Sequence, residues 1–258
     1  MGRLGVFVYG IVSYVIFFGT FVYLIGFGAN LVVPKSIDSG ETGPVAQAVL
    51  VNVILLGLFA LQHTVMARQS FKRWLTRFVP QAAERSTFVL VASLLLLLTA
   101  WQWRPIPEEF WSVRSPVGRG LLTALSFFGW GIVLYTTTLI DHFDLFGLRQ
   151  AYLHLRGQEY TPVEFQMVSL YKWVRHPLML GFIIAFWATP DMTVGHLLFA
   201  IVTTAYIFVG IHFEERSLVA AHGDGYRAYR GTVSMIVPMP RRQKEAVLPA
   251  GAGSETGL

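Results

Sequence analysis

The residues that could carry chemistry stand mostly at the ends of long apolar segments. Four stretches are polar enough to matter, and they are Gln62-His63, residues 141–150, residues 171–177 and residues 213–216. Each borders an apolar run long enough to form a helix. We expect the four stretches to lie at the same end of neighbouring helices and to converge on one pocket.

The segment Arg175-His176-Pro177 has the pattern of a helix start. Proline suits the first helical turn, because its missing N–H would have no partner there. Arg175 and His176 would then stand beside free backbone N–H groups, an arrangement that binds anions such as a carboxylate. The alternative is a basic anchor at a membrane edge, and these three residues alone favour it.

Two adjacent acids, Glu214 and Glu215, close an apolar run, where acids are costly. If the helix ends with the run, the two acids also oppose its dipole. A partner is therefore expected, and the candidates are Arg175, Arg216 or the hydroxyl or cationic groups of a ligand. A structural ion pair with Arg175 and a functional role are equally open.

Histidines near the same boundary raise the question of a metal site. His63, His142, His176 and His212 could act with Asp144, but no two histidines stand four residues apart on one predicted helix. We predict no metal, with at least two of these histidines facing water. The chain has no cysteine, which excludes disulfides, Cys-ligated metals and a Cys nucleophile.

The composition places these residues in a membrane protein. Of 258 residues, 54% are hydrophobic and 14% are charged, and the mean hydropathy is +0.53. Soluble domains carry about 25% charged residues. Because this surface would be apolar almost everywhere in water, soluble and disordered proteins are excluded. The net charge of +5 indicates basic cytoplasmic loops rather than nucleic-acid binding.

Uncharged runs predict the helices that position the polar stretches. The four spans lie over residues 4–33, 45–66, 87–103 and 120–140. A span needs about 20 residues, so residues 178–189 are too few, and Pro190-Asp191 predicts a turn before residues 192–213. The predicted fold class is all-α, a polytopic membrane bundle of four spans and a C-terminal helical hairpin, with a cytoplasmic cofactor pocket.

The basic residues predict the orientation. If the hairpin makes an even number of crossings, 16 of the 20 Lys and Arg residues fall on one side and 4 on the other. An odd number gives 10 on each side. The positive-inside rule therefore predicts that both termini are cytoplasmic.

Two further features complete the prediction from composition. Residues 1–240 form a single domain, and residues 241–258, rich in Ala, Gly and Pro, form a disordered tail. Trp101, Trp103 and Trp111 cluster at one predicted membrane boundary, as an interfacial aromatic belt would.

Two segments resemble the motifs of a known family. Residues 175–181 resemble the RHPxYxG motif of isoprenylcysteine carboxyl methyltransferases and related membrane methyltransferases. Residues 214–229 resemble their EExxLxxxFGxxYxxY signature, and the two motifs flank a helical hairpin there too. Met179 and His222 depart from the pattern, which has Tyr and Phe there, without removing the polar groups of the motifs.

This resemblance implies S-adenosylmethionine as the cofactor, bound between the hairpin and the segment that follows it. The residues implied to bind it are Tyr171, Val174, Arg175, His176, Leu178, Gly181 and Glu215.

Three further segments point to one branch of this family. They are Leu61-Gln62-His63, residues 101–105 and residues 141–150. Their combination looks like bacterial methanethiol S-methyltransferases, which make dimethyl sulfide, and it covers most of the chain. It implies a bacterial inner-membrane enzyme that methylates a small thiol. Gln62, His63 and Arg149 would line the substrate pocket.

A thiol acceptor makes the chemistry reasonable. An alkyl thiol titrates at or above about 8.5, so at neutral pH a base would help. Transfer from a sulfonium to a thiolate removes charge in the transition state, which a dry pocket favours. The candidates for the base are His142, Asp144, Glu214 and Glu215, and the sequence does not choose among them.

Three alternatives remain open from the sequence. A lipid, phenol or isoprenylcysteine-type methyltransferase would keep the donor and change the acceptor. An NADPH-dependent membrane reductase could use Arg149, Arg156 and Lys172 for the 2′-phosphate. A non-catalytic membrane protein of nitrogen-oxide metabolism has similar spans.

Overall fold

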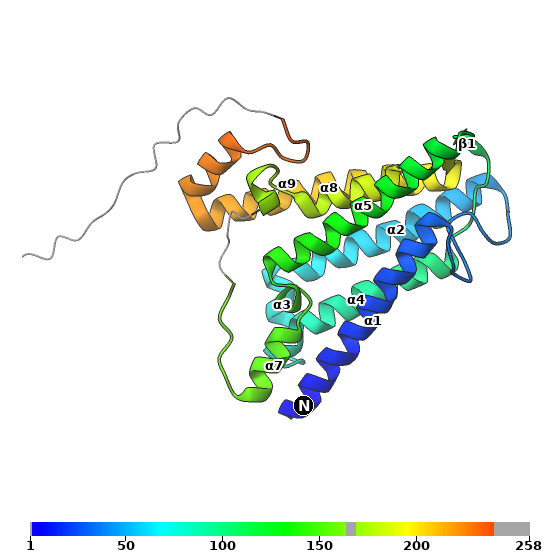
Figure 1. Ribbon diagram of the computed structural model, residues 1–258. Helices are drawn as coiled ribbons and strands as arrows, with labels where there is room; N and C mark the ends of the chain where they lie inside the picture. The colour runs from blue at the N-terminus through cyan, green and yellow to red at the C-terminus, as the bar shows by residue number, and fades with distance from the viewer. Residues whose placement is uncertain (1, 164–168, 240–258) are drawn as a thin grey trace, which may run out of the picture.

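The computed structural model describes residues 2–163 and 169–239, and they form a helical bundle (Figure 1). Helices long and apolar enough to cross a membrane are α1 (Arg3–Ala29), α2 (Val45–Ala67), α4 (Gln81–Gln102), α5 (Pro116–Ile140) and α9 (Val194–Thr232). Shorter elements are α3 (Gln69–Leu75), α6 (His142–Leu145), α7 (Leu148–Arg156), the 3₁₀ turn η1 (Ser169–Lys172) and α8 (Pro177–Trp187). The predicted all-α membrane bundle is confirmed. The predicted tail, residues 241–258, lies outside the described residues.

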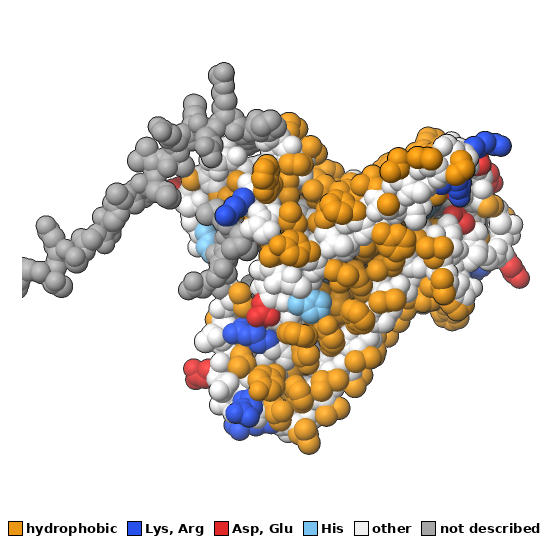
Figure 2. All heavy atoms as spheres, viewed as in Figure 1, with side chains coloured by type: hydrophobic (Ala, Val, Ile, Leu, Met, Phe, Trp, Pro, Cys, Tyr) orange, Lys and Arg blue, Asp and Glu red, His pale blue; other side chains and the backbone are white. Residues whose placement is uncertain are grey.

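Polar and apolar side chains separate along the bundle. On the face shown in Figure 2, charged side chains gather toward the two ends, and hydrophobic side chains cover the band between them. The N-terminus, α3 and α7 lie at one end, and β1 (Glu109–Ser112) lies at the other (Figure 1). This is the distribution expected of helices whose middle sections face lipid.

The predicted C-terminal hairpin is present. Leu180 packs against the cluster of Ile207, Ile211 and Ile236, and Trp187 Nε1 donates to Thr204 Oγ1 at 2.9 Å, so α8 and α9 run antiparallel. The predicted turn at Pro190-Asp191 leads into β2 (Asp191–Thr193), which pairs antiparallel with β1. The sequence analysis did not predict this small sheet, because strands of three and four residues leave no clear periodic signal.

Helices α5 and α8 approach each other closely at two glycines. A Cβ atom on Gly181 would lie 2.8 Å from the Gly129 carbonyl oxygen, and one on Gly129 would lie 2.6 Å from the Ala185 amide nitrogen. Real Cβ atoms do not tolerate such contacts, so small residues are required here, as in many membrane helix pairs. Helix packing therefore accounts for Gly181 independently of any cofactor.

The helix that carries Glu214 and Glu215 extends further than predicted. Helix α9 runs from Val194 to Thr232 with a kink at Gly223, so the two acids lie inside its first part and not at a C-terminus. The prediction of acids opposing a helix dipole was therefore wrong, because hydropathy reports where an apolar run ends and not where a helix ends. Similarly, α4 begins at Gln81, six residues before the predicted span.

One of the three tryptophans predicted to form an interfacial belt, Trp103, lies in the core instead. Trp101 is 68% exposed, but Trp103 is fully buried in a core cluster with Phe27 and Ile37. Its ring packs edge-on against Phe27, at 6.2 Å between centroids. Composition alone does not distinguish an anchor from a core residue two positions away.

Candidate functional site

The residues of the two motifs meet in one ion-pair network around Glu215. Its Oε1 accepts from Arg175 Nε at 2.7 Å and lies 3.2 Å from His176 Nε2, while its Oε2 lies 3.2 Å from Arg230 Nε. The side chains of Arg175, His176 and Glu215 are all less than 10% exposed. We call Arg175, His176, Glu214, Glu215 and Arg230 the Glu215 cluster.

The start of α8 holds Arg175 and His176 in place. Pro177 occupies the first helical turn, as predicted, and His176 is the N-cap residue. The residues just before Pro177 are held by backbone hydrogen bonds to the chain that follows α9. The Arg175 amide donates to the Ser234 carbonyl at 2.8 Å, and the His176 amide donates to the Met235 carbonyl at 3.1 Å. The ion pair between Arg175 and Glu215, one of the alternatives open from the sequence, is present and belongs to a wider network.

The two adjacent acids have different environments. Glu215 is buried among cations, which offset the cost of burying its charge. The side chain of Glu214 is 50% exposed, and its Oε2 lies 3.5 Å from His176 Nδ1. Glu214 can therefore contact a ligand, whereas Glu215 organises the side chains around it.

Buried tyrosines support the cluster. Tyr229 OH donates to the Tyr171 carbonyl oxygen at 2.6 Å, and both side chains are buried. Burial raises the pKa of the Tyr171 hydroxyl, and nearby Glu214 adds to this effect, so the hydroxyl stays neutral. Val174, also predicted at the cofactor, is buried and pairs with Ser234 in an isolated β-bridge.

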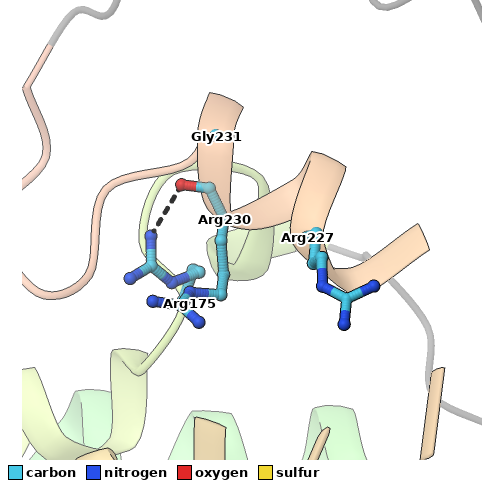
Figure 3. Close-up of a pocket in the computed structure, with 4 residues that line it drawn as sticks. All are labelled: Arg175, Arg227, Arg230 and Gly231. Carbon is cyan, nitrogen blue, oxygen red and sulfur yellow. Dashed lines mark hydrogen bonds between the residues drawn. The ribbon is translucent and has the colours of Figure 1, made fainter. Parts of the chain in front are cut away.

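A basic depression of about 390 Å³ opens beside the cluster. Its lining residues are Arg175, Arg227, Arg230 and Gly231 (Figure 3). Arg175 Nη1 donates to the Arg230 carbonyl oxygen at 3.1 Å, which ties the two sides of the depression together. Guanidinium groups around an open depression suit an anionic group such as a carboxylate.

Asp144 and Arg149 lie in a second group. Arg149 Nη1 donates to Asp144 Oδ1 at 2.9 Å and to the Thr161 carbonyl oxygen at 2.9 Å. Tyr160 OH donates to Asp144 Oδ2 at 3.2 Å. These contacts fasten the segment after α7 to α6, and Asp144 and Arg149 form an ion pair.

His142, a predicted base, has both ring nitrogens engaged. Thr137 Oγ1 donates its one proton to the Leu134 carbonyl oxygen at 2.7 Å, so it must accept from His142 Nδ1 at 2.8 Å. Tyr14 OH then donates to Nε2 of the neutral imidazole at 2.8 Å. Burial lowers the pKa of His142, which agrees with a neutral ring.

Gln62 and His63 lie in a third group, inside the bundle. His63 packs on Phe88 of α4 at 4.8 Å and lies near Tyr206 of α9 at 6.4 Å between ring centroids. Gln62 Nε2 contacts Met66 Sδ at 3.0 Å. Both residues stand two turns or less from the end of α2.

The structure thus places the predicted site residues in three groups, and their convergence on one pocket stays a prediction. Arg85 connects two of them, since its guanidinium lies 5.4 Å from the Phe88 ring centroid and its Nε donates to the Leu145 carbonyl oxygen at 2.8 Å. Leu178 and Gly181 lie on α8 directly after the Glu215 cluster. Over residues 2–163 and 169–239, no group of three or more His, Asp or Glu side chains is arranged to hold a metal ion.

The sequence analysis missed several residues that the structure brings to these groups. They are Tyr14, Arg85, Tyr160, Tyr206 and Arg230. A tyrosine or arginine within or beside an apolar run is a weak signal, because most such residues are interfacial anchors. A polar residue inside a predicted span, such as Tyr206, was the one available indication.

Comparison with known proteins gives relatives over nearly the whole chain. The chain is 58% identical over 235 residues to the methanethiol S-methyltransferase of Mycobacterium tuberculosis, covering 91% of this chain and 96% of that protein. It is 56% identical to methanethiol S-methyltransferase 1 of Bradyrhizobium diazoefficiens, covering 91% and 82%. It is 50% identical to the methanethiol S-methyltransferase of Crocosphaera subtropica, covering 92% and 93%. No protein-family model and no solved structure matches the chain.

Proposed function

Because the chain belongs to the methanethiol S-methyltransferase family, we propose that it methylates methanethiol to dimethyl sulfide with S-adenosylmethionine as donor, at the Glu215 cluster. The chain is a membrane methyltransferase that acts on a small molecule. The relatives do not favour the alternatives of a lipid methyltransferase, a reductase or a non-catalytic protein. The observation that carries the donor site is the buried network of Arg175, His176 and Glu215 beside an open basic depression.

The groups of this site fit S-adenosylmethionine. Arg227 and Arg230 line a depression that suits the methionyl carboxylate. The half-exposed carboxylate of Glu214 suits a hydroxyl or cationic group of the donor. The N–H groups of Leu178 and Met179 lie in the first turn of α8, where no helical carbonyl accepts from them. A helix start of this kind favours a negatively charged group.

The chain's own residues would act by binding and by excluding water. When bound, S-adenosylmethionine supplies a methyl group made electrophilic by a sulfonium. Glu215 holds Arg175, His176 and Arg230 in fixed positions, so the site does not have to reorganise during the reaction. An apolar cluster of Ile207, Ile211 and Ile236 lies between α8 and α9, and an apolar setting favours a step that loses charge.

The structure favours positioning roles for two of the predicted bases. His142 uses both ring nitrogens in hydrogen bonds to Tyr14 and Thr137, and Asp144 is held by Arg149 and Tyr160. The neutral His142 ring has no unused acceptor, and both carboxylate oxygens of Asp144 already accept hydrogen bonds. We assign both to holding α6 against its neighbours, and Glu214 to the donor.

The membrane orientation follows from the charge distribution. We place both termini on the cytoplasmic face of a bacterial inner membrane, because the hairpin keeps 16 of the 20 basic residues on that side. The Glu215 cluster then faces the cytosol. A reporter fused after Leu258 should be active only as a cytoplasmic reporter, and periplasmic activity would contradict this orientation.

The decisive experiment uses the purified protein in detergent. Incubation with S-adenosylmethionine and methanethiol should release dimethyl sulfide into the headspace, detected by gas chromatography. Arg175→Ala should abolish the product. Wild-type protein that binds S-adenosylmethionine but makes no dimethyl sulfide would refute the assigned acceptor.

A further inference from the structure

Two polar atoms at the end of α2 are not used by the donor site. Gln62 Oε1 and His63 Nδ1 are buried, and in the part of the chain that the structure describes they have no hydrogen-bond partner. Buried polar side-chain atoms are nearly always paired with protein, water or ligand. Two unpaired polar atoms on adjacent residues therefore indicate that something else completes this region.

Aromatic rings from three helices surround His63. Phe59 lies on α2 itself at 5.4 Å, Phe88 on α4 at 4.8 Å and Tyr206 on α9 at 6.4 Å, all between ring centroids. Thr64 Oγ1 lies 3.5 Å from Tyr206 OH, a contact at the limit of a hydrogen bond. Sulfur makes favourable contacts with aromatic rings at about 5 Å. An aromatic environment with buried acceptors matches a small thiol, which offers one weak S–H donor and an apolar body.

Helix α9 connects this region to the donor site. Tyr206 and Glu214 are eight residues apart on α9, which corresponds to about 12 Å along the helix axis. A nucleoside-sized donor at the Glu215 cluster can extend over such a distance. The aromatic region therefore lies where an acceptor thiol could approach the reactive end of the donor.

We propose that His63 is the catalytic residue that binds the methanethiol S–H through Nδ1 and takes its proton during methyl transfer, a proposal that rests on the proposed function. The thiol sulfur forms a bond to the donor methyl carbon. That carbon's bond to the donor sulfonium breaks, and its electron pair stays on the donor sulfur. The thiol proton goes to His63 Nδ1 and afterwards to water. Gln62 Oε1 is a second acceptor that orients the S–H group.

The charge balance supports this step. Arg85, whose guanidinium lies over the Phe88 ring, is the charged side chain next to His63. Its charge favours the negative charge that develops on the attacking sulfur. The imidazolium forms near Arg85, which opposes its positive charge, so the proton passes on to water rather than staying on His63, while the positive charge of the donor disappears. The step therefore moves a positive charge without separating two charges, which a dry region tolerates.

The test compares two acceptors of nearly the same shape. Methaneselenol is much more acidic than methanethiol and needs no base at neutral pH. His63→Gln should lower the rate with methanethiol by about 10²- to 10⁴-fold. The same variant should keep most of its rate with methaneselenol. His154→Gln, the same substitution on α7, is the control and should leave both rates unchanged.

Equal losses with both acceptors would overturn the proposal, because a residue that only shapes the site affects both. Unchanged rates with both acceptors would overturn it as well. Wild-type protein that methylates neither acceptor contradicts the proposed function instead, so the two failures are distinguishable.

A second measurement needs no methyl donor. In protein labelled with ¹⁵N histidine, methanethiol should shift the His63 ring signals and leave those of His154 in place. His63→Asn supplies the assignment if His63→Gln does not fold. A His63 signal that stays unmoved at saturating methanethiol would overturn the proposal.

Discussion

Arg230 Nε lies 3.2 Å from Glu215 Oε2, although the two residues are 15 positions apart on the same helix α9. A straight helix would separate them by about 22 Å. The distance closes because Gly223 leaves the helical conformation, with φ 56° and ψ −129°, and the chain turns back (Figure 1). Gly223 is therefore the residue that brings Arg230 back to Glu215.

Gly223→Ala should weaken donor binding. The backbone conformation of Gly223 is nearly confined to glycine, so a Cβ atom costs about 1–3 kcal/mol or forces the helix to straighten. Straightening would remove Arg230 from Glu215 and open the depression. Calorimetry should show a weaker affinity for S-adenosylmethionine.

The matched control for this prediction is Gly225→Ala. Gly225 lies two residues further along α9, and a Cβ atom there meets nothing within 4 Å. Donor affinity should stay at the wild-type value. If both variants bind the donor equally well, the bend at Gly223 does not assemble the site.

Glu215→Gln and Glu214→Gln should have different effects. Glu215 is buried among cations, so removing its charge leaves Arg175 unpaired and should cost about 3–5 kcal/mol of folding stability. Glu214 is half exposed, so Glu214→Gln should keep the melting temperature and weaken donor binding. Thermal denaturation and calorimetry on both variants check this. A greater loss of stability in Glu214→Gln would reverse the roles assigned to the two acids.

Hydropathy predicted most of the helices of the bundle. Each membrane span needs about 20 apolar residues, and runs of that length are easy to recognise in the sequence. The same signal ends at Phe213, where the polar half of α9 begins. It therefore could not show that Glu215 lies inside a helix or that Arg230 returns to it. The family motifs identified Arg175, His176 and Glu215, but contacts between distant segments, such as His63 with Tyr206, have no local signature.

Stability should depend on the protonation of His142. Burial lowers the pKa of this residue below its usual value of about 6.5, so in this range the unfolded chain binds more protons than the folded chain. The free energy of unfolding should fall as the pH drops from above 6.5 through the folded-state pKa. The charged ring would also lose the hydrogen bond that Tyr14 OH donates to Nε2.

His142→Asn removes this titration while its side-chain amide still offers a donor near Thr137. Its melting temperature should be lower than that of the wild type at pH 8, and the difference should shrink toward pH 5. Melting curves over this pH range measure the effect. A difference that stays constant with pH would show that the lowered pKa of His142 does not contribute to stability.

Asp144→Asn separates a positioning role from a catalytic one. Asp144 holds Arg149 and Tyr160, and Arg149 in turn holds Thr161, so the carboxylate fastens the segment after α7. Loss of its charge should lower stability by about 1 kcal/mol, because the pair is partly exposed. Arg149→Gln should cause a similar loss, and the double variant should lose less than the sum, since both changes break one interaction. Methyl transfer per folded molecule should stay within a few-fold of the wild type.

If Asp144 is instead the base, turnover should fall about 10²- to 10⁴-fold and recover as the pH rises, because more thiolate then forms in solution. Turnover measured against pH, together with melting temperatures of the three variants, decides between the two roles.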